Sequence, residues 1–250
     1  YFTATRDNSD NEIKDANRRT YCLKSKGEDV FGEWENVVEI KLPEDLRAID
    51  ATFMDYNGKQ YIVWAGWPEK NHTIDYRQDL YIAELAEKDP TKAKTTEGKR
   101  VMISTPEYDW EKLGASQNEG PCVAFAPDGT PILMYSAGYS GSDGYSIAYL
   151  TLTGEDPLLK EHWTKCDKPL METDLKEKDV ISPGHNSVVK SPDGKEDWIV
   201  YHAAKYSGAG WDRTLRLQKL EWDGNVPKVE LSAWTEEVNL PSGDVSEKVK

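Results

Sequence analysis

The chain has 250 residues, of which 45 are acidic and 31 basic, so its formal charge is −14 and its isoelectric point is about 4.8. So acidic a chain lacks the basic surface that nucleic-acid binding requires, and it contains no run of about 18 apolar residues that could cross a membrane as a helix. We therefore expect neither nucleic acid nor a membrane as a partner. Three widely spaced cysteines argue against a zinc site and a disulfide framework, although one disulfide stays open.

Strand-like runs follow one another from the first residue. Residues 1–5 are typical of the second strand of a four-stranded unit, and residues 21–24 of its third strand. Three later pairs of apolar runs flank Asn-Gly or Asp-Gly turns; these pairs are 49–54 with 61–65, 119–125 with 132–136, and 184–189 with 198–202. Because such turn residues tolerate positive φ, the sequence predicts three β-hairpins at matching intervals.

A third strand candidate follows each hairpin, at 80–85, 145–150 and 215–220, and residues 101–104 add a fourth strand. Repeated units of four antiparallel strands are typical of β-propeller blades, with a β-sandwich as the alternative; no long helix is predicted. We expect an all-β chain with one domain over 1–250, divided into blades at about 1–45, 48–105, 117–170 and 183–235. The first of these blades is expected to lack its innermost strand.

Three polar residues recur at the start of the first strand of successive units, namely Asp50, Glu119 and His185. In a propeller these strands line a central channel, so the three side chains are expected to meet at one mouth. Two neighbouring carboxylates disfavour each other's ionisation, so one of them can stay protonated near neutral pH. A protonated and an ionised carboxyl group are what glycosidic cleavage uses. The spacing does not decide which carboxylate has which role, and solvated loop acids are the alternative.

Several segments together resemble glycoside hydrolase family 43. They are 48–53 (Ala-Ile-Asp-Ala-Thr-Phe), 118–121 (Asn-Glu-Gly-Pro), 182–187 (Ser-Pro-Gly-His-Asn-Ser) and 211–213 (Trp-Asp-Arg). Segments 61–67 and 106–111 match the arabinofuranosidase-like members. The similarity covers essentially the whole chain in order. It implies a five-bladed β-propeller, with the first blade and part of the second absent from this chain, that cleaves α-L-arabinofuranosides, β-xylosides or arabinan with inversion.

The resemblance also implies roles for individual residues. Glu119 matches the general acid of the family, and Asp50 matches the aspartate that raises the pKa of that acid and orients it. Arg213 matches an arginine that contacts substrate hydroxyls, and Trp67 is a candidate for stacking on a sugar ring. His185 matches a histidine on the propeller axis, near which many members hold a water molecule or a calcium ion. No cofactor is required, but a structural Ca²⁺ on the axis, bound to His185 through water, is compatible with the resemblance.

The general base is the main departure from the family pattern. In the family it is an aspartate on the inner strand of the first blade, before any residue of this sequence, so we expect the base not to be present in this chain. Asp7, in an acidic run at 7–12, is expected on a connecting loop and does not replace it. We interpret the chain as a fragment of a longer enzyme; a blade supplied by another chain and a non-catalytic sugar binder are the alternatives.

The predicted function is release of terminal α-L-arabinofuranosyl residues from plant cell-wall polysaccharide. A β-xylosidase or arabinanase of the same family is the closest alternative, and a protein-interaction propeller without sugar affinity is a more distant one. The expected partner is an arabinose- or xylose-containing oligosaccharide or polysaccharide. A secreted or periplasmic location is favoured because polysaccharide-degrading members are often exported. The sequence does not determine the oligomeric state.

Overall fold

The computed structural model describes residues 2–6, 14–29, 31–70, 76–86, 100–176, 180–230 and 240–244. Within these ranges the chain forms 15 strands in four antiparallel sheets, and its helical residues are confined to short 3₁₀ turns. The expectation of an all-β chain without long helices is therefore confirmed. The 3₁₀ turns are η1 (Lys14–Asn17), η3 (Asp109–Lys112) and η4 (Lys160–His162).

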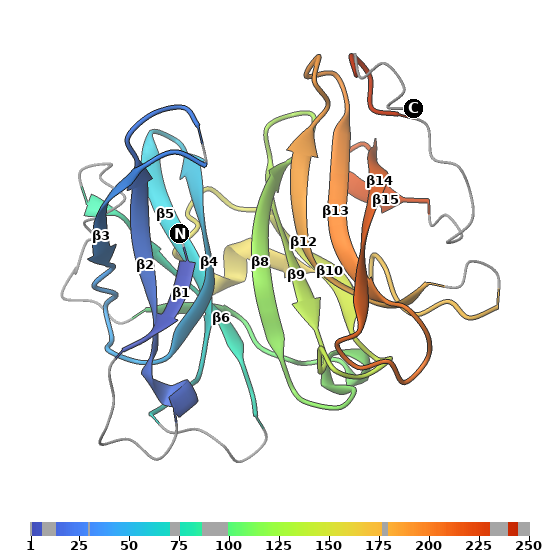
Figure 1. Cartoon of the computed structure of the whole chain (residues 1–250). Helices are drawn as coiled ribbons and strands as arrows, with labels where there is room; N and C mark the ends of the chain where they lie inside the picture. Colours follow the sequence, from blue (N-terminus) through green and yellow to red (C-terminus); the bar gives the residue numbers. More distant parts are fainter. Residues whose placement is uncertain are drawn as a thin grey trace.

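The strands of each sheet are consecutive in the chain (Figure 1). The first sheet consists of β1 (Phe2–Thr5), β2 (Arg18–Ser25) and β3 (Trp34–Glu39). The second consists of β4 (Ala48–Tyr56), β5 (Lys59–Gly66), β6 (Asp79–Glu84) and β7 (Val101–Ser104). The third consists of β8 (Asn118–Phe125), β9 (Pro131–Ala137), β10 (Ser146–Leu152) and β11 (Trp163–Lys165). The fourth consists of β12 (Ile181–Lys190), β13 (Asp197–Ala204), β14 (Arg213–Asp223) and β15 (Val226–Val229).

The three predicted hairpins are present as β4–β5, β8–β9 and β12–β13. Their turns contain Gly58, Gly129 and Gly194, which have positive φ angles of 75°, 89° and 74°. Glycine adopts such angles without steric penalty, so the local sequence is sufficient to produce these turns. The sequence pattern does not predict the outer strands β3, β11 and β15.

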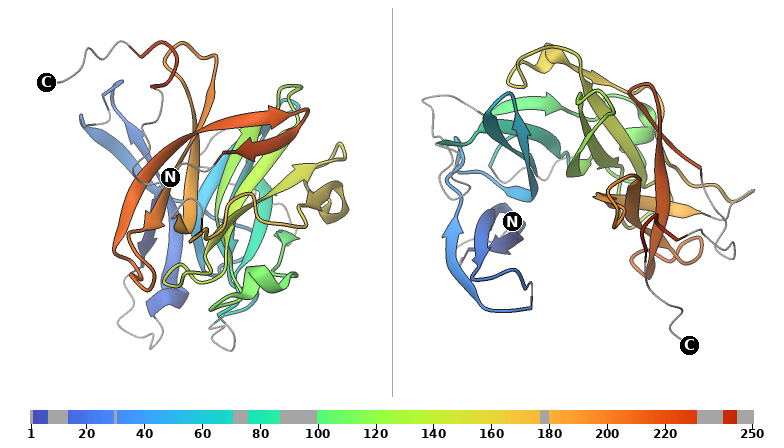
Figure 2. Two further views of the ribbon diagram at one scale, coloured as in Figure 1. Left: turned by 90° about the vertical axis from the view of Figure 1, so that its right-hand side faces the viewer. Right: turned by 90° about the horizontal axis from the view of Figure 1, so that it is seen from above.

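The sheets stand around a common centre like the blades of a propeller (Figure 2). Their inner strands are neighbours, because β4 contacts β8 and β8 contacts β12. In the view from above, the described strands leave the ring open between the first and the fourth sheet. The starts of β4, β8 and β12 therefore lie at one end of the molecule, around its centre.

Each pair of adjacent sheets encloses an apolar cluster of its own. Cys22 of β2 packs with Ile62 and Trp64 of β5, whereas Val63 of β5 packs with Leu133 of β9 on the other side. A further cluster lies between the third and fourth sheets. Strands β5 and β9 are covered on both faces, and this explains why they read as continuous apolar runs rather than as alternating patterns.

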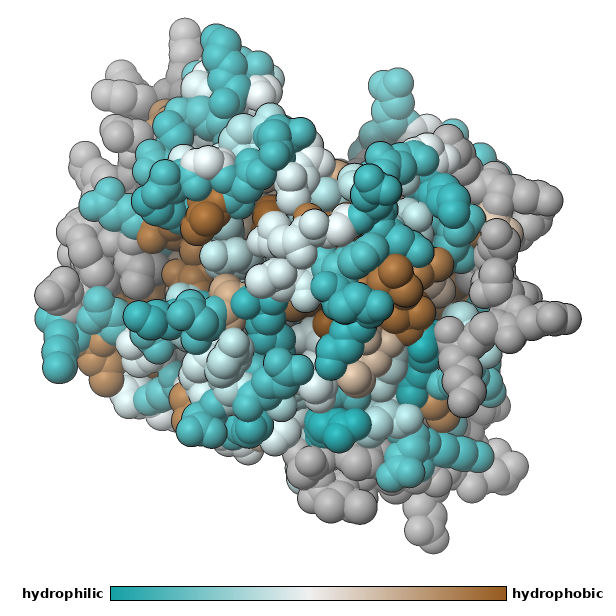
Figure 3. Space-filling model, turned by 180° about the vertical axis from the view of Figure 1, so that it is seen from behind, coloured by the Kyte–Doolittle hydropathy of each residue, from teal (hydrophilic) through white to brown (hydrophobic). Residues whose placement is uncertain are grey.

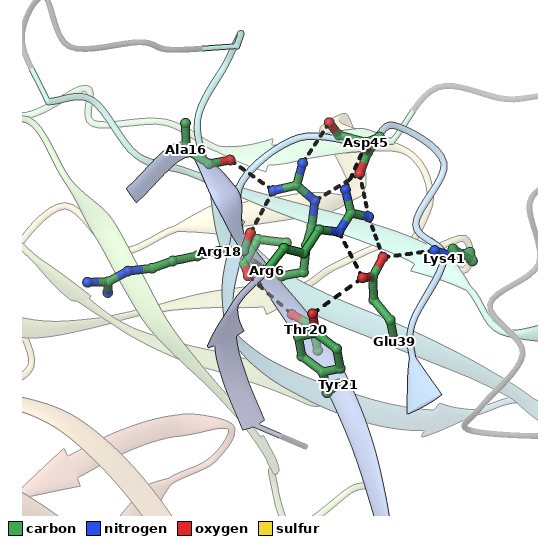
Figure 4. Close-up of polar contacts among 10 residues, drawn as sticks. Arg6, Ala16, Arg18, Thr20, Tyr21, Glu39, Lys41 and Asp45 are labelled. Atoms are coloured by element: carbon green, nitrogen blue, oxygen red, sulfur yellow. Dashed lines mark hydrogen bonds and ion pairs between the residues drawn. The ribbon is translucent and has the colours of Figure 1, made fainter. Parts of the chain in front are cut away.

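Ion pairs connect the first sheet to the segment before β4 (Figure 4). The guanidinium of Arg6 contacts the carboxylates of Glu39 and Asp45, and Arg19 donates to Asp45 over 2.8 Å. The bond from Arg6 lowers the pKa of Glu39 to about 2. These contacts hold β1, β2 and β3 against the second sheet, so that β1 lies beside β4.

All three cysteines are free, so the disulfide left open by the sequence does not form. The surface seen from behind is largely hydrophilic, with small separate hydrophobic patches, in keeping with the charged composition (Figure 3). Among the described residues, no helix is long and apolar enough to cross a membrane.

Candidate active site

Strands β4, β8 and β12 each carry a bulge near the start, and, apart from Ser182 in β12, one residue of each strand has a left-handed backbone there. These residues are Asp50 in β4, Gly120 in β8 and His185 in β12, with φ angles of 55°, 57° and 52°. The pairing register shifts at the same places. Such a backbone costs about 1–3 kcal/mol for a residue other than glycine, and it is retained where it aims a side chain. Asp50 and His185 therefore owe their directions to these bulges.

The sequence predicted that Asp50, Glu119 and His185 occupy equivalent positions in their strands, and the bulges show that they do not. Just before each bulge, Ile49 pairs with Ala65, Glu119 with Ser136 and Gly184 with His202. Asp50 and His185 thus correspond to Gly120, and Glu119 lies one position earlier. The sequence could not show this offset, because the hairpin loops differ in length and the bulges break the count.

This offset gives the two carboxyl groups different environments. Glu119 occupies the position that Ile49 and Gly184 hold in the other sheets, and only 8% of it is exposed. The side chains of Asp50 and His185 are 18% and 44% exposed. One carboxyl group is therefore removed from water while the other stays partly hydrated.

The structure brings Asp50, Glu119 and His185 together, as the sequence predicted. The backbone N–H of Gly120 donates to Oδ2 of Asp50 over 3.2 Å, and Nε2 of His185 lies 4.0 Å from Oδ1 of Asp50. A Cβ atom on Gly120 would lie 3.2 Å from the imidazole of His185, so glycine lets that ring approach the strand. Thr3 of β1 also reaches the site, since its hydroxyl accepts a 3.1 Å bond from the N–H of Asp50.

Glu119 has two hydrogen-bond donors, and both are neutral. The hydroxyl of Tyr145 donates over 2.7 Å, and the amide nitrogen of Gln78 donates over 3.1 Å. Burial raises the pKa of Glu119, and the charge of Asp50 raises it further, against the opposing effects of the Tyr145 bond, His185 and Gln78. The carboxyl group of Glu119 therefore keeps its proton to a higher pH than an exposed glutamate.

Arg47 sets the orientation of Gln78. Its Nη1 donates to the Gln78 side-chain oxygen over 2.6 Å. A guanidinium can only donate, so the amide nitrogen of Gln78 must face Glu119. Gln78 and Arg47 are 3% and 5% exposed, which fixes this line of contacts inside the protein.

Arg213 is held beside a stack of three rings. His202 stacks on Tyr145 with ring centroids 6.0 Å apart, and His185 stacks on His202 at 6.1 Å. Arg213 lies 5.5 Å from the centre of the Tyr145 ring and 2.9 Å from Nδ1 of His202. Burial, together with the charges of Arg213 and His185, lowers the pKa of His202 to about 4, so His202 is neutral near pH 7 and accepts the bond from Arg213.

Sequence reasoning does not identify several contributors to this site, among them Tyr145, Gln78, His202 and Ser136. Tyr145 is completely buried and was interpreted only as the start of a third strand. Ser136 accepts a 2.7 Å bond from the N–H of His185. The one available signal was Gly184, because a Cβ atom there would overlap the ring of Tyr145. A strand glycine often marks such a close approach.

Trp67 does not have the placement expected of a sugar-stacking residue. It is 4% exposed, and the guanidinium of Arg47 lies 4.9 Å from the centre of its ring. That ring is packed into the protein and presents no open face. The resemblance made Trp67 a candidate for sugar stacking, but the sequence around it equally describes a core residue.

A metal ion has no ready set of ligands in the described parts of the chain. No group of three or more His, Cys, Asp or Glu side chains there is arranged to hold one. His185 and Asp50 offer two groups at most, so a Ca²⁺ held through water near His185 stays a prediction. The acidic run that contains Asp7 falls in 7–13, outside the described residues.

Comparison with known proteins assigns the family. The model of glycosyl hydrolases family 43 matches residues 1–227, so the chain belongs to this family. It is 32% identical over 215 residues to an extracellular exo-α-(1→5)-L-arabinofuranosidase of Streptomyces avermitilis, covering 83% of this chain and 42% of the relative. It is also 32% identical to α-L-arabinofuranosidase 43 of Humicola insolens, covering 84% of this chain and 43% of that protein.

Solved structures agree with the family assignment. The crystal structure of an α-L-arabinofuranosidase from Lactobacillus brevis superposes with a TM-score of 0.72 at 32% identity, covering 84% of this chain and 65% of that one. A thermostable family-43 glycoside hydrolase gives a TM-score of 0.69 at 30% identity, covering 82% and 66%. The chain thus spans less than half the length of the two curated relatives named above.

Proposed function

We propose that this chain carries the acid side of the active site of an inverting α-L-arabinofuranosidase. The observation that carries the proposal is the environment of Glu119, which is buried, bonded to Tyr145 and Gln78, and next to Asp50. A carboxyl group with a raised pKa suits proton donation to a departing glycosidic oxygen near neutral pH. The names of the relatives favour arabinofuranosides over the β-xylosides and arabinan that remain the alternatives.

In the proposed reaction, the proton of Glu119 passes to the glycosidic oxygen while the bond from that oxygen to the anomeric carbon breaks. A water molecule attacks the anomeric carbon from the opposite face and gives its proton to a carboxylate base. The charge of Asp50 helps to keep the pKa of Glu119 raised. Arg213, fixed by 2.9 Å bonds to Ser182 and His202, is the proposed contact for substrate hydroxyls. His185 lines the site beside Asp50.

We assign the base to neither Asp50 nor Glu119. Inverting enzymes separate their two carboxyl groups by about 6.5–9.5 Å to leave room for the water molecule. Asp50 is instead bonded to Gly120, the residue next to Glu119, on the same side of the site. The base is therefore proposed to come from a segment beyond the four described sheets.

A fifth blade in the open part of the ring would bring that segment. Leu215 and Leu217 of β14 are 74% and 38% exposed, and they alternate with residues such as Leu220 that pack toward the third sheet. Thr3 of β1 faces Asp50, so Phe2, which is 39% exposed, points the other way. Apolar side chains thus border the opening from both of its sides, as they would if a further blade packed between them.

The proposed partner is an arabinose-containing polysaccharide of plant cell walls, and the proposed location is outside the cell. The word "extracellular" in the name of the Streptomyces avermitilis relative supports this location. Binding of sugar without turnover would instead identify a carbohydrate-binding module.

The test compares aryl α-L-arabinofuranoside with aryl β-xyloside for the protein with the proposed base-bearing blade in place and for its Glu119→Gln variant. We expect faster nitrophenol release from the arabinofuranoside. Glu119→Gln should reduce hydrolysis of arabinan oligosaccharides by about 10² to 10⁴-fold, the usual effect of losing a general acid. The loss should be smaller for the nitrophenyl substrate, whose leaving group needs less protonation. Glu107→Gln, a half-exposed glutamate with 48% of its side chain in solvent, is the control. An unchanged rate for Glu119→Gln on oligosaccharides would exclude Glu119 as the acid.

A further inference from the structure

Two loops lie beside the candidate site at the same end of the sheets. Residues 138–144 connect β9 to β10 and lead into Tyr145, which donates to Glu119. Residues 205–212 connect β13 to β14 and lead into Arg213. Both loops are at the lower end of the molecule in Figure 1. Both loops therefore adjoin residues of the candidate site, Tyr145 in one case and Arg213 in the other.

The second loop exposes Trp211, of which 67% is accessible to solvent. Its ring and that of Tyr139 make a T-shaped contact, with centroids 5.8 Å apart and planes at 76°. Its indole N–H donates to the hydroxyl of Ser140 over 3.3 Å. The ring is thus held along its edge by the first loop.

Further bonds fasten the two loops to each other. Asp143 accepts bonds from the hydroxyl of Ser207 over 2.5 Å and from the N–H of Gly208 over 3.0 Å. Tyr139 is itself constrained, because a Cβ atom on Gly141 would lie 2.8 Å from its ring. Contacts within each loop and between the two loops therefore hold the residues that support Trp211.

We propose that Trp211 is the stacking surface for a second sugar ring, the one adjoining the residue released at Glu119. This inference rests on the proposed function and names a binding position for a pentose ring of an arabinan or xylan oligosaccharide. Single exposed apolar residues are ordinary on protein surfaces, but ordering a large side chain costs conformational entropy. Here the ring is ordered while much of it stays in water, and an apolar ring beside a sugar site suits the C–H face of a sugar.

The experiment measures trisaccharide binding by calorimetry with the full chain in a Glu119→Gln background, so that the ligand is not consumed. The probes are α-1,5-linked arabinotriose and β-1,4-linked xylotriose. Trp211→Ala should weaken the better-bound trisaccharide by about 2- to 13-fold, the range expected for one aromatic contact. Trp211→Phe should retain most of the affinity. Trp34→Ala is the matched control. Trp34 is 43% exposed and lies in the first sheet, opposite Ser25 at the end of β2, and this sheet contains neither of the two loops.

Two results would overturn the inference. One is that neither trisaccharide binds the parent protein, and the other is that Trp211→Ala binds as tightly as the parent or no more weakly than Trp34→Ala. A second measurement distinguishes failure of this inference from failure of the proposed function: the turnover of the single-ring aryl arabinofuranoside by the Trp211→Ala variant. That turnover should be retained, since one ring does not reach Trp211. Its absence in the unmodified protein with the base-bearing blade in place counts against the proposed function instead.

Discussion

Glu111, shortly before β8, and Glu119, near the start of β8, are both buried, yet their surroundings shift their pKa values in opposite directions. Glu111 is fully buried and accepts bonds from Nζ of Lys165 over 2.8 and 3.1 Å. It also accepts bonds from Asn118, Tyr135 and the backbone N–H groups of 107 and 108. Glu119 has only the neutral donors Tyr145 and Gln78.

Burial acts in the same direction on both carboxyl groups, and the neighbouring groups decide whether its effect on the pKa is offset. Burial raises the pKa of Glu111, but the bonds and charge of Lys165 and the backbone N–H groups more than offset this, so its pKa is lowered. Burial raises the pKa of Glu119 as well, and the nearby charge there belongs to Asp50, which has the same sign. One glutamate is a structural anion, and the other is suited to hold and donate a proton.

The largest effect on stability is expected from breaking the structural pair. Glu111→Gln leaves the ammonium of Lys165 buried without its counter-charge, which typically costs about 3–5 kcal/mol. Unfolding in urea should show the loss, and adding Lys165→Met should recover part of it. Glu107→Gln is the control from the same loop, because its contact with Lys160 is half-exposed, at 3.6 Å, and should contribute about 0–1 kcal/mol. Equal midpoints for the two single variants would contradict this interpretation of Glu111.

A second, intermediate effect is expected from Asp50→Asn. Removing the charge of Asp50 takes away one cause of the raised pKa of Glu119, so that pKa should fall. The alkaline limb of the kcat/KM profile, which reports loss of the acid's proton in the free enzyme, should move to lower pH. Asp128→Asn removes one charge at the turn at the far end of β8 and should leave the profile in place. A profile that does not move in Asp50→Asn would show that Asp50 does not act on Glu119.

The smallest effect is a pH dependence of stability that differs in sign between the two glutamates. The folded-state pKa of Glu119 is raised, so its favourable contribution is complete below the unfolded pKa and is lost as pH rises through the folded pKa. The folded-state pKa of Glu111 is lowered, so its contribution is present above the unfolded pKa and is lost as pH falls through the folded one. Urea midpoints of Glu119→Gln relative to the parent should therefore increase from acidic to neutral pH. A constant difference across that range would mean that Glu119 titrates normally.

Much of the candidate site could be anticipated because it follows from local signals repeated along the chain. Hairpin turns at Gly58, Gly129 and Gly194 place the inner strands at regular intervals, and Asp50, Glu119 and His185 lie near the starts of those strands. The nearness of the three residues thus needed only the blade repeat. Their proposed catalytic and binding roles rest on the family pattern and await the experiments above.

Other parts of the site depend on contacts that no local pattern encodes. Tyr145, Gln78 and His202 come from second and third strands or the loops beside them, and their sequence surroundings are those of ordinary buried residues. Local sequence does not predict the exposure of a tryptophan either. Trp67, after an apolar strand, is packed under Arg47, whereas Trp211, in a loop, is exposed. Exposure depends on which distant segment covers a ring.

The amino-acid sequence by itself determined most of the strands, the hairpin turns and the repeat of strands in each sheet, since these depend on backbone preferences and apolar periodicity over a few residues. Only the tertiary structure decided that Glu119 is buried while Asp50 stays partly hydrated, because a one-residue bulge sets each side chain's environment. The pKa of a carboxyl group responds to the charges and donors within a few ångströms of it. Those neighbours, from Gln78 to Tyr145, come from strands that are adjacent only after the sheets have packed.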